Sequence, residues 1–163
     1  MRRDVKTSVS LLVAGTLALS LFGCASGYVE PDYGNAPAIK FVNSSGLPVA
    51  LEIYRGAPAC TDRSIVHPAV PPGESRTLKV ESGELSFAAV QDLSTRVTSF
   101  GVEVEGCELA TSFRPAPGHT YTYTFYQSGG ACSYRLTEAG RSVPHEDRKW
   151  RRAFGESGPW CEA

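Results

Sequence analysis

Cysteine is the residue type whose chemistry says most about this 163-residue chain. Cys24 stands alone near the N-terminus, and the other four cysteines are Cys60, Cys107, Cys132 and Cys161. No two of them are spaced as Cys-x-x-Cys, the arrangement typical of thioredoxin-like redox centres and of zinc knuckles. An even number of widely spaced cysteines is instead typical of disulfides in an exported protein. We therefore expect two disulfides, with Cys24 left over.

The first 23 residues have the organisation of a secretory signal. Arg2, Arg3 and Lys6 precede an uncharged apolar run with small residues near its end, which is the pattern of a signal peptide. The run contains polar residues and is shorter than the roughly 20 apolar residues that a transmembrane helix needs. We therefore expect residues 1–23 to be removed as a signal peptide.

The end of this run, Leu21-Phe22-Gly23-Cys24, resembles the lipobox of bacterial lipoproteins, with an aliphatic residue, a small residue before the cut and an obligatory cysteine after it. The resemblance covers only the first two dozen residues. It implies a diacylglycerol on Cys24 and an acylated amine, and two or more acyl chains anchor a protein stably. Ala25 in place of Asp implies the outer membrane, with the protein on the periplasmic side. The alternative is an ordinary thiol after a conventional cleavage site.

Charge argues against a nucleic-acid partner. Residues 1–23 carry three basic and one acidic residue, so 13 basic and 16 acidic residues remain, a net charge near −3. Nucleic-acid binding calls for a strong positive excess. We therefore expect attachment to a membrane to come from the lipid, not from basic side chains. The chain that remains is long enough for one domain with a hydrophobic core.

Composition divides the chain after the signal into three parts. Residues 24–37 hold Cys24 and a segment with two prolines and little aliphatic content, which predicts a flexible tether. Such a tether, fully extended, would reach about 40 Å. Residues 38–140 are expected to form the domain, and residues 141–163 a tail that packs on it.

Apolar and polar residues alternate through much of the predicted domain, with the period of half-buried strands. Val49, Leu51 and Ile53 are one such set. The pattern predicts seven to eight strands, near residues 39–43, 48–55, 75–81, 84–91, 97–105, 108–114, 119–127 and 131–137. Short strands separated by turn residues predict an all-β fold, a two-sheet antiparallel sandwich, with a small barrel as the alternative.

Two phrases resemble those of immunoglobulin-like and transthyretin-like extracytoplasmic modules. Pro72-Gly73-Glu74-Ser75 precedes one predicted strand, and Pro117-Gly118-His119-Thr120-Tyr121, after Phe113, opens another. The second phrase resembles a tyrosine corner, in which a tyrosine hydroxyl bonds to nearby backbone. The domain is also similar to small Gram-negative lipoproteins. These resemblances imply the sandwich fold and assign no activity.

The parity of the cysteines suggests how they pair. Cys107 and Cys132 share the parity of neighbouring apolar residues, so both are expected to point inward. If the strands near 108–114, 119–127 and 131–137 pair in that order, these two cysteines lie at one end of a sheet. Among the three possible connectivities, we favour Cys107–Cys132 with Cys60–Cys161.

The tail contains the most suggestive charged cluster. Acidic residues come first and basic ones last in residues 146–154, the order that a helix dipole favours, so the tail is predicted to be helical there, or irregular. The candidate binding residues are Arg148, Lys149, Trp150, Arg151 and Arg152. They would suit anionic lipid, peptidoglycan carboxylates or an acidic protein. The alternative is a solvated helix that covers one end of the sheet, with Trp150 as its anchor.

Catalytic and cofactor motifs are missing from the sequence. It has no Gly-x-Ser-x-Gly, His-Glu-x-x-His or Gly-rich phosphate loop, and His67, His119 and His145 lack the spacing of metal ligands. We expect no enzyme, metal or cofactor. The expected function is a membrane-anchored binding or envelope-assembly module facing the periplasm. The alternative is a lipoprotein that inhibits or scavenges an external hydrolase such as a lysozyme.

Overall fold

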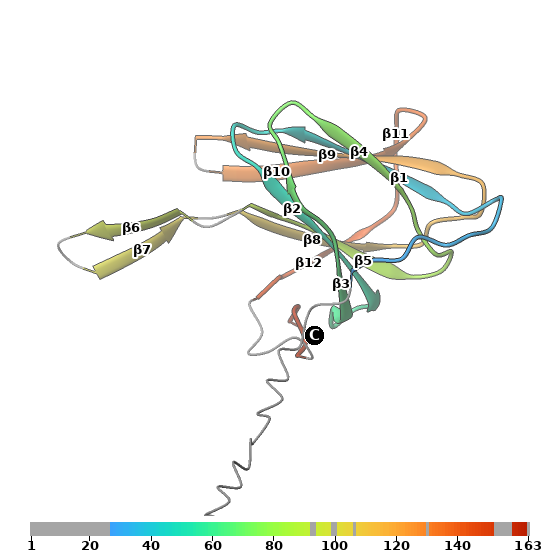
Figure 1. Ribbon diagram of the computed structural model, residues 1–163, viewed down its shortest axis with the longest axis horizontal. Helices are drawn as coiled ribbons and strands as arrows, with labels where there is room; N and C mark the ends of the chain where they lie inside the picture. The colour runs from blue at the N-terminus through green and yellow to red at the C-terminus, as the bar shows by residue number, and fades with distance from the viewer. Residues whose placement is uncertain are drawn as a thin grey trace, which may run out of the picture.

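Strands make up all the regular structure in the part of the chain that the computed structural model describes, residues 27–91, 94–98, 101–105, 107–129, 131–151 and 158–162 (Figure 1). No helix in these ranges is long and apolar enough to cross a membrane. The predicted signal, the lipobox and Arg152 lie outside them. The strands are β1 (Ala38–Ser44), β2 (Val49–Gly56), β3 (Thr61–Val70), β4 (Ser75–Lys79), β5 (Leu85–Gln91), β6 (Ser94–Thr98), β7 (Gly101–Glu105), β8 (Glu108–Phe113), β9 (Thr120–Ser128), β10 (Ala131–Glu138), β11 (Arg141–Ser142) and β12 (Glu146–Arg148).

Ten of these strands form the two layers of a sandwich. One sheet has the order β11-β10-β9-β1-β4 and the other the order β12-β8-β5-β2-β3. β1 and β9 are parallel, and the other neighbours are antiparallel. β6 and β7 form a separate hairpin that projects from one end of the sandwich (Figure 1). The all-β sandwich predicted from the sequence is confirmed, with one parallel pair in it.

Alternating apolar residues fill the space between the two sheets. Val49, Leu51 and Ile53 of β2 are buried there, as their parity predicts. The rings of Phe41, Phe87 and Tyr123 meet across the layer, and the Phe87 and Tyr123 centroids are 5.0 Å apart. Because Phe41 and Tyr123 come from one sheet and Phe87 from the other, this cluster joins the layers.

The tyrosine corner and both disulfides are confirmed. The Ala116 amide donates to the Tyr121 hydroxyl over 2.9 Å. Cys107, which precedes β8, is bonded to Cys132 of β10, with Cα atoms 5.8 Å apart. The predicted pairing of β8 with β9 is wrong, however, because the two strands lie in different sheets. The bridge forms because both cysteines face the layer between the sheets, so it joins one sheet to the other.

Three strand predictions differ from the structure. The alternation pattern does not predict β3, because Pro68 and the polar residues in Thr61–Val70 interrupt it. The single strand expected at 97–105 is the hairpin of β6 and β7. Glu81-Ser82-Gly83-Glu84 predicts a tight hairpin between residues 75–81 and 84–91, but none forms there, because β4 pairs with β1 whereas β5 pairs with β2 and β8. A turn signal in the sequence does not say which sheet the next strand joins.

The helix predicted at 146–154 is also wrong in its described part. Glu146–Arg148 form β12, which runs antiparallel to β8, and Trp150 makes an isolated bridge to Cys161. Residues 152–154 lie outside the described ranges. The charge order suits a helix, but pairing with the free edge of β8 satisfies the same backbone groups and covers that edge.

The N-terminal belt, residues 27–37, lies against the domain. The Tyr28 amide donates to the Ile65 carbonyl of β3 over 3.1 Å. The Tyr28 hydroxyl donates to the carbonyl of Lys79, at the end of β4, over 3.0 Å. The Glu30 carboxylate accepts from the Lys79 amide. Composition predicts a flexible tether at 24–37, whereas the described residues 27–37 are docked, because Tyr28 and Glu30 bond to the two edge strands β3 and β4.

Candidate functional site

The C-terminal strap, residues 146–151 and 158–162, begins as the edge strand β12 and then lies on the outer face of the sheet that contains β2, β5 and β8. Small residues form the floor beneath it: Ser86, Ala88, Ala110 and Ser112. Outward-facing residues of a sheet are normally exposed, yet these are at most 3% exposed. The strap buries them and makes a second, smaller apolar cluster with Tyr54, Cys60, Trp160 and Cys161.

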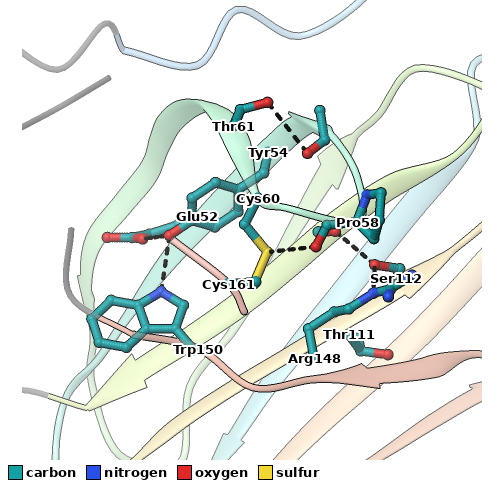
Figure 2. The surroundings of a disulfide bond; sticks show 12 residues. Glu52, Tyr54, Pro58, Cys60, Thr61, Thr111, Ser112, Arg148, Trp150 and Cys161 are labelled. Carbon is teal, nitrogen blue, oxygen red and sulfur yellow. Dashed lines mark hydrogen bonds between the residues drawn. A yellow bond between two sulfur atoms is a disulfide. The ribbon is translucent and has the colours of Figure 1, made fainter. Parts of the chain in front are cut away.

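The Cys60–Cys161 disulfide fixes the end of the strap, as predicted (Figure 2). Cys60 lies in the turn between β2 and β3, where it has a φ of 52°. That turn is tight, since a Cβ on Gly56 would lie 1.8 Å from the Thr61 hydroxyl oxygen. The Cys161 amide also donates to the Ala59 carbonyl over 3.2 Å. Backbone and sulfur bonds thus hold the same few residues together.

A buried charged network lies under the strap. The Glu52 carboxylate, only 4% exposed, accepts hydrogen bonds from the Tyr54 hydroxyl and the Arg63 guanidinium. The guanidinium carbon lies 4.3 Å from the centroid of Trp160, a favourable cation–π distance. The Trp150 indole donates to the Tyr54 hydroxyl over 3.0 Å (Figure 2). Burial, followed by the negative charge of Glu52, raises the pKa of Tyr54 well above its ordinary value.

The structure does not bring the predicted basic residues onto one surface. Arg148 turns toward the sheet, where its Nε donates to the Ser112 hydroxyl over 2.8 Å. Lys149 is exposed, and its Nζ lies 2.9 Å from the Glu162 carboxylate. Trp150 packs on Trp160, with centroids 5.7 Å apart. Arg151 is exposed, and Arg152 lies outside the described residues. This arrangement favours the anchoring interpretation of Trp150, on a strap that is not a helix.

A cleft of about 890 Å³ opens beside the segment that connects β11 to β12. Glu84 and Glu146 form ion pairs with Arg114 and Arg148, and Glu138 is hydrogen-bonded to the His119 ring. Arg141 also lines the cleft, and it has no ion-pair partner among the residues that the structure describes. Arg141 is therefore the cation of this cleft that no described acidic residue neutralises.

A smaller cleft of about 420 Å³ adjoins the first at His145. In it the Tyr134 hydroxyl donates to Asp147, and Nε2 of His145 lies 4.0 Å from the same carboxylate. Burial, together with the bond to Asp147, raises the pKa of Tyr134, so the phenol keeps its proton to a higher pH than an ordinary tyrosine. The contact of β10 with β12 through these two residues ties the sheets together. It offers no activated nucleophile.

The three histidines lie apart. His67 is on β3, His119 precedes β9 and His145 follows β11. In the described part of the chain, no three His, Cys, Asp or Glu side chains gather in a way that would hold a metal ion.

A comparison with protein-family models and with curated proteins finds no match for the chain. The site is therefore interpreted from its own geometry.

Sequence reasoning missed Glu52, Arg63 and Arg141. Glu52 stands in an alternating strand, where its position predicts a solvated carboxylate. A signal for its burial was available in the small residues that share its face of the sheet, Ala88 and Ala110, because a floor of small residues leaves room for a covering segment.

We predict that the two disulfides differ in their contribution to stability. The Cys60→Ser/Cys161→Ser variant should lose about 4.5 kcal/mol of the free energy of unfolding, because it opens a loop of 101 residues. The Cys107→Ser/Cys132→Ser variant opens 25 residues and should lose about 3.5 kcal/mol. Urea unfolding followed by circular dichroism measures both. A larger loss for the second variant would contradict this assignment.

Stability should also fall at high pH because of Tyr54. The unfolded chain ionises this phenol near pH 10, whereas the folded protein keeps its proton to a higher pH. The stabilisation is complete below pH 10 and is lost as the pH rises above it. Tyr54→Phe should make the decline above pH 10 shallower in urea titrations. The control Tyr126→Phe changes an exposed phenol and should leave the decline as it is.

Proposed function

We propose that the protein is an exported lipoprotein, anchored through acylated Cys24, whose domain is a non-catalytic binding or envelope-assembly module on the periplasmic side of the outer membrane. The observation that carries the proposal is the pairing of the other cysteines. Four of the five are joined in two disulfides. Cys24 is the fifth cysteine, at the position where a lipobox requires a thiol.

Two features support export to an oxidising compartment. Each disulfide is part of an apolar cluster. Cys107–Cys132 belongs to the cluster between the sheets, and Cys60–Cys161 to the cluster under the strap. Disulfides of this kind persist in the periplasm and are rare in the cytosol. The export proposal therefore rests on the folded domain as well as on the leader.

The cleft beside β11 and β12 is the proposed binding surface of the module. It combines Arg141 with the paired charges of Glu84 and Glu138 and with the apolar side chains of Val143 and Pro144. A mixed lining of this kind suits a protein segment better than a small apolar ligand. No residue of the cleft is assigned a catalytic role in this proposal.

The second candidate function is inhibition of an external hydrolase such as a lysozyme. It is favoured by the β6–β7 hairpin, which projects from the sandwich and pairs with no other described strand (Figure 1). A hairpin of two strands is marginally stable alone in water. A partner's groove would cover it.

The anchor is tested with Cys24→Ser. The variant should leave the membrane fraction and should take up no labelled palmitate, because it lacks the thiol that receives diacylglycerol. Cys60→Ser/Cys161→Ser serves as the control, since it removes two thiols and leaves Cys24 in place; it should still be labelled. Palmitate labelling of the Cys24→Ser variant would contradict the proposal.

Purified protein separates the two functions. An inhibitor should slow the hydrolysis of peptidoglycan by a lysozyme at stoichiometric concentration. A variant in which residues 94–105 are replaced by a short Gly/Ser turn should lose the effect. An assembly module should leave the hydrolysis rate unchanged with either form. Inhibition that persists without the hairpin would overturn its proposed role.

A further inference from the structure

We propose that the side of the sandwich formed by the β3 edge and the N-terminal belt rests directly on the bilayer in which the Cys24 lipid is inserted. This inference rests on the proposed lipid anchor and adds to it an orientation of the domain. The partner of this surface is the lipid headgroup region.

The linker, residues 24–26, joins the acylated cysteine to the domain, and its length limits how far the domain can move from the membrane. Gly27 forms a parallel bridge with Ile65 of β3. Cys24 precedes Gly27 by three residues, which span at most about 11 Å. A flexible segment of the length predicted from composition would have a root-mean-square reach of about 20 Å, and about 40 Å fully extended.

Residues of the N-terminal belt can extend this linker only if their hydrogen bonds to the domain break. It is bonded in succession to both sheets, by Tyr28 to Ile65 and to Lys79, and by the Tyr33 hydroxyl, which accepts from the Ser82 amide. Arg55 lies over the Tyr28 ring at 5.9 Å. Burial raises the pKa of Tyr28 to about 12, because the phenol is partly enclosed between the two edge strands.

The domain is wider than the linker is long. A domain of this size has a radius of gyration of about 14 Å. With its attachment point at most about 11 Å from the acylated cysteine, the β3 side is held within about that distance of the headgroups. Val29, two residues after Gly27, is the most exposed of the large hydrophobic residues described, with 76% of its surface accessible. The headgroup region would cover it.

The same geometry turns the binding cleft away from the membrane. β3 and β12 are the opposite edges of one five-stranded sheet, and the cleft lies beside β12. Four strand spacings separate these edges, roughly 19 Å. The cleft is therefore open to a partner in the periplasm.

The orientation can be tested by the rates at which two native histidines are chemically modified. His67, on β3, accepts a hydrogen bond from Arg76 of β4 at the side proposed to face the bilayer. His145 lies at the opposite edge. The mature lipidated protein, in vesicles of phosphatidylethanolamine and phosphatidylglycerol, is treated with diethylpyrocarbonate and compared with soluble Cys24→Ser protein. Peptide mass spectrometry should show a several-fold slower modification of His67 on vesicles, with His145 unchanged.

Two insertions sharpen the test. Fifteen Gly/Ser residues between Ser26 and Gly27 should restore the soluble rate at His67, because the domain can then leave the surface. The same insertion after Gly129, in the β9–β10 turn, should leave the protection intact.

The outcomes separate the two proposals. An acylated protein whose His67 reacts at the soluble rate would overturn the orientation and leave the anchor standing. Equal protection of His145 would also overturn the orientation. If the mass of the N-terminal peptide shows no lipid, the anchor itself fails, and the orientation fails with it.

Discussion

In a two-layer sandwich, the apolar layer between the sheets is open to water along the two sides where the sheets end. In this domain, a segment outside the central strands closes each of these sides. On one side the N-terminal belt connects β3 to β4 through Tyr28. On the other, the chain crosses from β11 to β12, and Tyr134 bonds to Asp147. Each segment also covers strand edges that would otherwise invite pairing with another chain. The two closing segments therefore stabilise the domain and close its apolar layer at both sides.

The strap adds a second core, on a face that a simple sandwich would leave in water. Its position depends on the Cys60–Cys161 disulfide, because it contributes few other apolar side chains besides Trp150 and Trp160. Beneath it, Glu52 and Arg63 are paired away from bulk solvent. A buried ion pair of this kind contributes little net stability, but removing one partner costs several kcal/mol. The network thus favours one position of the strap over others.

In the proposed lipoprotein, these two sides would have different orientations relative to the membrane. The belt begins three residues after Cys24, so the side of the domain that it closes is the side nearest to the proposed lipid. The opposite side carries the cleft with Arg141. A domain held close to the bilayer has less orientational freedom than one on a long tether, which raises the effective concentration of the cleft toward partners at a fixed height.

Local residue patterns determined the all-β fold, the inward parity of Val49 and the tyrosine corner, because period-two burial and turn chemistry act over a few residues. The parity of Cys107 and Cys132 also favoured their bridge, although the strand pairing expected with it, β8 with β9, is wrong. Only the tertiary structure decided which sheet each strand joins, as β8 and β9 illustrate, since a turn between two strands permits either choice. The tertiary structure also made a strand of the charged segment Glu146–Arg148, where the free edge of β8 satisfies its backbone, and it docked residues 27–37 on partners far away in the sequence. Tyr28 looks like a linker residue until Ile65 and Lys79 lie beside it, because hydrogen bonds between residues so far apart leave no local pattern in the sequence.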